Sequence, residues 1–266
     1  MISVLLKSIV KRSPLSAVAH RLYYALGFQS QNAAYDQQTV EVMKRCLGER
    51  SIGVDVGANT GDILSEMVAI APKGEHYVFE PIPQLARKLG ERHPGLHVYE
   101  VALSDCKGES DFQHFVNMSG YSGLGVRNAR SVPSGGRSEV ATIRVRTDRL
   151  DDIVPADTKI DFMKLDIEGA EHAAMKGAFN TIVRSKPLIV FEASKETLCL
   201  FDVTPHAIYD YLTGDCRLNV STMKRWLNGG PALSRRAFWS SITFHLDTYF
   251  IAYPENRIAA RPTQAA

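Results

Sequence analysis

The sequence predicts an α/β protein in which helices cover both faces of a parallel sheet, with a helical cap before it. From residue 51 onward, short apolar runs typical of buried strands alternate with stretches of helical periodicity. The connections are short enough for right-handed crossovers between parallel strands. The 266 residues are 45% hydrophobic and 23% charged, as in globular proteins and unlike disordered ones.

The cap is predicted from the pattern of the first 48 residues. Apolar residues recur at helical spacing between Leu15 and Leu26, and a second helix is expected over about 35–47, with Gly48 as its cap. The alternative is an amphipathic segment that rests on a membrane surface. The expected parts of the chain are therefore a helical cap, a main domain and a frayed tail, over 1–48, 49–256 and 257–266.

The elements of the main domain follow in order along the chain. The spacing of apolar residues and the positions of turn-forming residues predict strands over 52–56, 76–79, 96–103, 111–116, 142–145, 160–165, 188–191 and 248–253. They predict helices over 63–71, 84–92, 170–184 and 204–212. A loop rich in Gly and Ser is expected over 117–139, either closing over a bound acceptor or exposed on the surface.

Composition excludes several classes of function. Lys plus Arg number 31 and Asp plus Glu number 29, a net charge of +2 that is too balanced for a dedicated nucleic-acid binder. The four cysteines form no CxxC pair, and no apolar run is long enough for a membrane-spanning helix. The N-terminal charges follow the apolar stretch instead of preceding it, unlike a signal peptide. We therefore expect a cytoplasmic protein, with residues 1–48 as the only part suited to the inner face of a membrane.

The first motif, DVGANTGD over 55–62, lies where a predicted strand ends and a helix begins. Ligands of open α/β sheets bind at this edge, and glycines let the backbone turn tightly beside them. The spacing is neither the G-x-G-x-x-G of dinucleotide binding nor a Walker loop, which favours a small nucleoside-like ligand. This argues against a nicotinamide-dependent oxidoreductase. Asp55 is placed to contact a cation or an ammonium group.

Two further motifs end the next two strands. Glu80 follows Gly57 by 23 residues, the place of an acid that accepts hydrogen bonds from ribose hydroxyls. A carboxylate can accept from both hydroxyls of a diol. Ser104 and Asp105 follow the third strand and could hold a base, or form an ordinary turn.

The fourth motif, KLDIEGAE over 164–171, gathers one cation and three acids after the strand 160–165. Strand alternation places Lys164 and Asp166 on the same side, so they can pair. The motif is either a substrate-hydroxyl or metal site, or a salt bridge followed by helix N-terminal acids. Glu192 ends the next strand at the same edge.

The combination of DVGANTG, FEP, ALSD, KLDIEGAE and a strand ending in FE resembles the FkbM-type methyltransferases, over about 52–194. The resemblance implies a class I, Rossmann-like sheet of seven mostly parallel strands with a reversed last strand. It also implies S-adenosylmethionine as methyl donor and O-methylation of a hydroxyl on a sugar, glycan or polyketide-type acceptor. The competing hypothesis is a non-catalytic nucleoside-binding, partner-binding or membrane-binding module on the same fold.

The resemblance also assigns roles to residues. The residues that line the methionine part of the donor are Asp55, Gly57, Asn59 and Gly61. Glu80 holds the ribose, Ser104 and Asp105 lie near the adenine, and Lys164, Asp166 and Glu168 face the transfer site. The acceptor proton could pass to Asp166, Glu168 or Glu192, or the same acids could hold Mg²⁺.

Overall fold

The computed structural model describes residues 31–125 and 139–257, in a chain that divides into two compact units over 1–38 and 39–266. Helix α3 (Gln31–Cys46) begins in the first unit and covers the helix expected before Gly48. The helix expected over 15–26, most of the loop expected over 117–139 and the end of the tail lie outside the described residues. No helix in the described ranges is long and apolar enough to cross a membrane.

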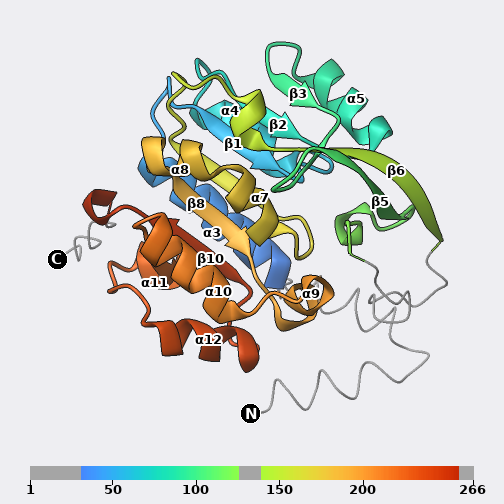
Figure 1. The fold of residues 1–266 in the computed structure, drawn as a ribbon. Helices are drawn as coiled ribbons and strands as arrows, with labels where there is room; N and C mark the ends of the chain where they lie inside the picture. The colour runs from blue at the N-terminus through green and yellow to red at the C-terminus, as the bar shows by residue number, and fades with distance from the viewer. Residues whose placement is uncertain (1–30, 126–138, 258–266) are drawn as a thin grey trace, which may run out of the picture. The chain divides into compact units, whose positions relative to one another are not determined.

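The main sheet of the second unit has seven strands in the order β3-β2-β1-β7-β8-β10-β9 (Figure 1). Strand β10 is antiparallel to both of its neighbours, and the other neighbouring pairs are parallel. The strands are β1 (Gly53–Val56), β2 (Tyr77–Phe79), β3 (His97–Tyr99), β7 (Phe162–Leu165), β8 (Leu188–Glu192), β9 (Asn219–Thr222) and β10 (Tyr249–Tyr253). The predicted seven-stranded, mostly parallel sheet with a reversed last strand is confirmed.

A second sheet of three strands has the order β4-β6-β5, with β4 (Ala102–Leu103), β5 (Gly108–Phe115) and β6 (Val140–Asp148). The prediction of one strand over 96–103 is wrong, because this apolar stretch serves both sheets. Its first part pairs with β2, and after the exposed Glu100 its last two residues pair with β6 instead. The strand expected over 142–145 is longer than predicted, since β5 and β6 pair along eight residues.

The helices and shorter turns connect these strands. They are α4 (Asp62–Ile70), α5 (Pro83–Arg92), η1 (Ser119–Tyr121), α6 (Leu150–Ile153), α7 (Glu171–Gly177), α8 (Phe179–Ser185), α9 (Lys195–Leu198), η3 (Cys199–Phe201), α10 (Pro205–Asp210), η4 (Tyr211–Asp215), α11 (Met223–Leu227), α12 (Arg235–Thr243) and η5 (Glu255–Arg257). Thr204, the first residue of the helix predicted over 204–212, is the N-cap of α10, and its hydroxyl accepts a hydrogen bond from the Ala207 N–H at 3.2 Å.

The single helix predicted over 170–184 is in fact two helices. The helix is interrupted at Ala178, directly after Gly177, and Ala178 is both the C-cap of α7 and the N-cap of α8. A β-carbon on Gly177 would lie only 1.9 Å from the Ser104 carbonyl oxygen, so glycine allows the segment after β4 to pass against the end of α7. A break made by a contact between segments so far apart in the chain leaves no mark in helical periodicity. The sequence analysis also missed β9, α11 and α12, which are short or largely polar.

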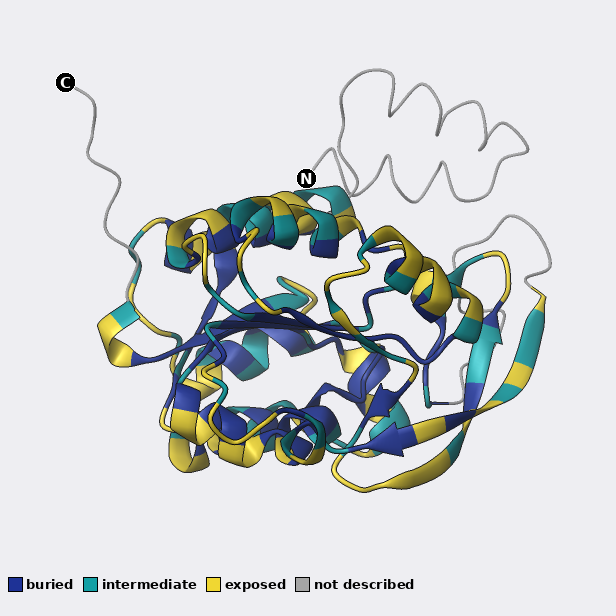
Figure 2. Ribbon diagram, turned by 90° about the horizontal axis from the view of Figure 1, so that it is seen from above, coloured by how far each residue is buried: buried dark blue, intermediate teal, exposed yellow. Residues whose placement is uncertain are grey.

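The core lies on both faces of the main sheet, and strand alternation explains the layering. Val78 in the middle of β2 packs with Leu64 of α4 and Leu89 of α5. Its neighbours Tyr77 and Phe79 point to the opposite face and join the larger cluster, which includes Met175 of α7, Ile182 of α8, Ile208 of α10 and Phe238 of α12. Figure 2 shows helices on both sides of the buried strands. The parallel strands bring their carboxyl ends to one edge of the sheet.

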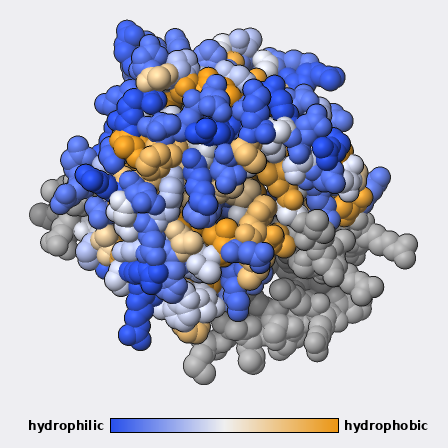
Figure 3. Space-filling model, viewed as in Figure 1, coloured by the Kyte–Doolittle hydropathy of each residue, from blue (hydrophilic) through white to orange (hydrophobic). Residues whose placement is uncertain are grey.

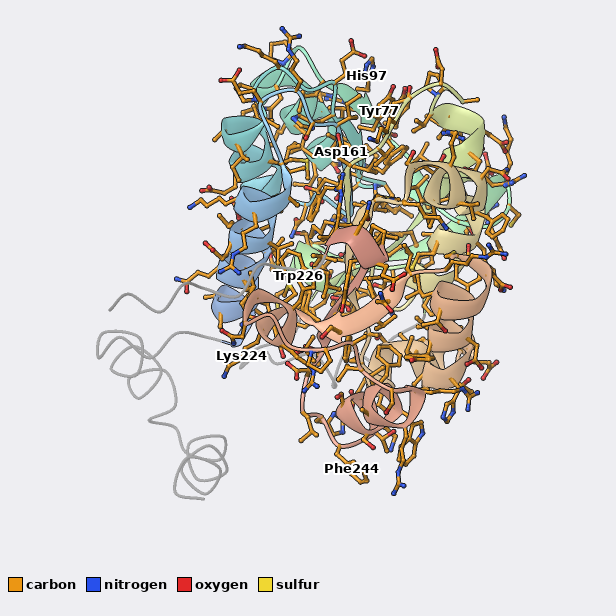
Figure 4. The ribbon with its side chains drawn as sticks, turned by 90° about the vertical axis from the view of Figure 1, so that its left-hand side faces the viewer. Tyr77, His97, Asp161, Lys224, Trp226 and Phe244 are labelled. Carbon is orange, nitrogen blue, oxygen red and sulfur yellow. The ribbon has the colours of Figure 1, made fainter. Side chains whose placement is uncertain are left out.

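The outer surface is mixed, as the composition predicts. In Figure 3 hydrophilic residues dominate the face shown, with hydrophobic groups between them. The two tryptophans follow the usual preference of aromatic residues for packing. Trp226 (labelled in Figure 4) is buried beside Tyr253 and donates its indole N–H to the Arg257 carbonyl at 3.1 Å. Trp239 stacks on His206.

Candidate functional site

The turn between β1 and α4 needs left-handed backbone at three positions. Gly57, Asn59 and Gly61 have φ angles of 74°, 50° and 83°. Glycine adopts such angles freely, and asparagine tolerates them better than most residues. At Gly57 a side chain is also excluded by space, since a β-carbon there would lie 2.3 Å from the carbonyl oxygen of Asp166. The turn after β1 and the turn after β7 therefore touch through backbone.

Glu80 lies at the end of β2 and faces this turn. Its side chain is nearly fully buried, and its two carboxylate oxygens accept hydrogen bonds from the backbone N–H groups of Asn59 at 2.8 Å and Ile82 at 2.9 Å. Burial raises the pKa of the Glu80 carboxyl above its ordinary value, against the lowering effect of these two hydrogen bonds. A buried carboxylate is thus held beside the left-handed turn of the first motif.

Lys164, the cation of the fourth motif, contacts residues of both the first and the fourth motif. The Lys164 ammonium lies 3.4 Å from Asp55 Oδ1 and 3.6 Å from Asp166 Oδ2, and it donates a hydrogen bond to the Gly57 carbonyl at 3.2 Å. Burial lowers the pKa of Lys164, but the two carboxylates outweigh it and leave this pKa above its ordinary value. Burial also raises the pKa of Asp55. The charged Lys164 side chain of β7 therefore links this strand to Asp55 of β1.

Asp166 has a second partner that the sequence analysis did not find. The hydroxyl of Tyr249, in the first position of β10, donates a hydrogen bond to Asp166 Oδ2 at 2.9 Å. Burial, followed by the charge of Asp166, raises the pKa of Tyr249 well above its ordinary value. The Asp166 side chain keeps 30% of its surface exposed. Tyr249 and Lys164 thus both contact Asp166 Oδ2, while the carboxyl group remains partly exposed.

The turn after Asp166 is itself unusual. Glu168 and Gly169 have φ angles of 61° and 107°. Glu171 closes this turn from the start of α7, because its Oε1 accepts a hydrogen bond from the Ile167 N–H at 2.9 Å. Glu171 is fully buried, and burial raises its pKa to about 7. The sequence analysis assigned Glu171 no role beyond a helix N-terminal acid, and the structure shows that it supports the turn that carries Glu168.

The remaining predicted residues fall into two groups. Glu192 ends β8 opposite Tyr249 in the register of the sheet, so it lies at the same edge as Asp166. Ser104 and Asp105 follow β4 in the second sheet, where Ser104 lies against the end of α7 and Asp105 is exposed. The structure therefore brings together, at one edge of the main sheet, Asp55, Gly57, Asn59, Gly61, Glu80, Lys164, Asp166, Glu168 and Glu192.

The segment that follows β5 reaches this edge as well. The Ser119 hydroxyl donates a hydrogen bond to Asn59 Oδ1 at 2.7 Å. A β-carbon on Gly123 would lie 3.1 Å from the Glu168 β-carbon, which places the two residues side by side. Neither contact was predicted, because both join residues from distant motifs and only the Gly- and Ser-rich composition of the loop pointed to this region.

The arrangement of the acidic side chains at this edge gives no support to a metal site. Among residues 31–125 and 139–257, no group of three or more His, Cys, Asp or Glu side chains could hold a metal ion. Asp55 and Asp166 instead share the Lys164 ammonium. The described residues thus do not fit the Mg²⁺ that the sequence analysis considered.

Comparison with known proteins agrees with this geometry. Residues 55–218 match the model of the methyltransferase FkbM domain, a span from the first motif to just before β9. The chain is 28% identical over 170 residues to the 2-O-methyltransferase NoeI of Sinorhizobium fredii, covering 60% of this chain and 70% of that protein. It is also 25% identical over 175 residues to the antimetabolite synthetase AmbE of Pseudomonas aeruginosa, covering 53% of this chain and 8% of AmbE.

Among solved structures, an FkbM methyltransferase from Methylobacillus flagellatus aligns with a TM-score of 0.48 and 18% identity, covering 78% of this chain and 44% of that one. The chain thus spans less than half of that protein. The domain match covers more than half of the present chain and includes the motifs at the ends of β1, β2, β7 and β8. The chain therefore belongs to the FkbM methyltransferase family.

Proposed function

We propose that this methyltransferase uses S-adenosylmethionine to methylate a hydroxyl group on a sugar, glycan or polyketide-type acceptor. The observation that carries the proposal is the meeting of the left-handed turn after β1, the buried Glu80 and the Lys164–Asp166 pair at one sheet edge. This edge is where α/β sheets of this kind bind their ligands. The name of the S. fredii relative supports oxygen as the methylated atom.

The residues at this edge fit the donor chemically. The buried Glu80 carboxylate can accept from ribose hydroxyls with the lone pairs that the two backbone N–H groups leave available. The Asp55 carboxylate is fully buried, and the Lys164 ammonium is its cationic neighbour at 3.4 Å. The backbone of the turn would contact the methionine part, and Ser104 and Asp105 would lie on the adenine side.

The donor, when bound, supplies an activated methyl group on a sulfonium. The chain has to orient the acceptor oxygen for in-line displacement and to receive its proton. We assign the proton to Asp166, because Tyr249 and Lys164 hold one of its oxygens while the group remains partly exposed. Glu168 and Glu192 would contact the acceptor, and Lys164 would hold the Asp166 carboxyl group in place.

Transfer of a labelled methyl group from S-adenosylmethionine to a panel of hydroxylated glycans and polyketides tests this proposal. We expect the wild type to label at least one acceptor on oxygen. The Asp166→Asn variant should bind the donor normally and lose turnover by about 10²-fold or more, as expected for loss of a general base. Full activity of this variant would remove Asp166 from the mechanism, and labelling on nitrogen or carbon alone would contradict O-methylation.

A further inference from the structure

The segment from Ser119 to Gly125 crosses the edge of the main sheet that carries the candidate site. It starts at η1 beside Asn59, passes Glu168 at Gly123, and reaches Leu200 and Phe201 of η3 at Gly125, where a β-carbon would lie 3.0 Å from both. We call residues 119–125 the strap. The strap therefore contacts the turn after β1, the turn after β7 and the segment after β8.

The strap lies between β5 and β6, and hydrogen bonds and packing attach it to β5. Gly123 exchanges two backbone hydrogen bonds with Gln113 of β5, at 2.9 and 3.1 Å. The Ser122 hydroxyl accepts a hydrogen bond from the Phe115 N–H at 3.0 Å. Leu124 packs against a buried cluster that includes Ile82 and Phe112. These anchors place the strap independently of any ligand.

Ser119 connects the strap to the turn after β1, which includes Asn59. Its hydroxyl bonds the side chain of Asn59, while the backbone N–H of Asn59 bonds Glu80. Asn59 also has the left-handed backbone, with φ of 50°, that a side chain makes costly. Two hydrogen bonds thus fix Asn59: Glu80 holds its backbone N–H, and Ser119 holds its side-chain oxygen.

We propose that Ser119 is a positioning residue for Asn59 and that the strap walls the part of the donor site that takes the amino-acid end of S-adenosylmethionine. This inference rests on the proposed function. It adds a residue from the segment between β5 and β6 to a site otherwise built from the main sheet. Ser119 orders the Asn59 side chain before the donor arrives, while the backbone N–H of Asn59 keeps its own hydrogen bond to Glu80. The Ser119 hydroxyl therefore strengthens binding of the amino-acid end and leaves binding of the adenosine half unchanged.

The test compares the binding of three compounds by titration calorimetry: S-adenosylmethionine, S-adenosylhomocysteine and 5′-methylthioadenosine, which lacks the amino-acid end. For Ser119→Ala we expect about two- to tenfold weaker binding of the first two, the effect of one hydrogen bond, and unchanged binding of the third. Ser119→Thr, which keeps the hydroxyl, should restore the affinity. Ser110→Ala is the matched control, because Ser110 is a half-buried serine of β5 whose hydroxyl donates a hydrogen bond to the Asp111 carbonyl and not to the turn after β1.

Hydrogen exchange of the unliganded protein gives a second readout. Ser119→Ala should speed exchange of the amides in the turn over 57–61 and leave the unfolding temperature unchanged. Equal affinities of wild type and Ser119→Ala for S-adenosylmethionine would overturn the inference and leave the proposed function standing, as would equal weakening of all three compounds. Failure of the wild type to bind S-adenosylmethionine at all would overturn both.

Discussion

Replacing Lys164 with Met removes a buried cation and keeps an unbranched side chain of similar length. The ammonium lies between Asp55 and Asp166, at 3.4 and 3.6 Å, and also bonds the Gly57 carbonyl. Removing one partner of a buried ion pair costs about 3–5 kcal/mol, because the other charge stays buried. Asp55 is fully buried and carries this cost, whereas Asp166 is 30% exposed and adds little.

The cost should depend on pH in a definite direction. Burial already raises the pKa of Asp55, and the loss of Lys164 raises it further. A carboxyl group with a raised pKa binds its proton more tightly in the folded state than in the unfolded state, where the pKa is about 3.9. Its stabilising contribution is present below that value and is lost as pH rises through the folded pKa. Lys164→Met should therefore be less destabilised at about pH 5 than at about pH 8.

Urea unfolding followed by circular dichroism at both pH values measures these changes. The double variant Asp55→Asn with Lys164→Met is the control, since it removes both charges and should recover most of the lost free energy of unfolding. The reasoning would be refuted by a cost below about 1 kcal/mol for Lys164→Met at both pH values. It would equally be refuted by a double variant no more stable than the single one.

Three further predictions concern neighbouring positions. Gly57→Ala should cost about 2–4 kcal/mol, from a left-handed φ of 74° and a β-carbon 2.3 Å from the Asp166 carbonyl, and should weaken donor binding; calorimetry and urea unfolding check both. Tyr249→Phe should lower kcat by about tenfold with the acceptor KM little changed, because the hydrogen bond to Asp166 is lost; steady-state kinetics decide. Glu171, with a pKa raised to about 7, gives the wild type stability that is lost as pH rises from about 4.3 through about 7; Glu171→Gln should remove this loss in unfolding experiments from about pH 4 to pH 8.

The residues that the sequence places correctly at the edge are those whose position follows from strand ends. Asp55, Glu80, Asp166 and Glu192 each end or follow a parallel strand, and parallel strands bring their carboxyl ends to the same side. The glycines of the first motif equally predict the turn after β1, because few other residues accept left-handed backbone. These features are local, so a single sequence reveals them.

The features that the sequence analysis missed depend on contacts between distant segments. Tyr249 reaches Asp166 only because β10 inserts antiparallel beside β8 and starts at the edge that carries the candidate site. Ser119 reaches Asn59 only because the second sheet carries the strap across that edge. The break between α7 and α8 and the change of sheet after Glu100 likewise follow from neighbours in space. No periodicity encodes such contacts.

The most direct test of the account is a calorimetric titration of the purified protein with S-adenosylmethionine and S-adenosylhomocysteine, with Glu80→Ala in parallel. We predict micromolar binding of both compounds by the wild type and a loss of roughly 1–3 kcal/mol in the variant, the cost of removing a buried hydrogen-bonding partner. Well-folded wild-type protein that binds neither compound, or a Glu80→Ala variant that binds both as tightly as the wild type, would contradict the placement of the donor at this edge.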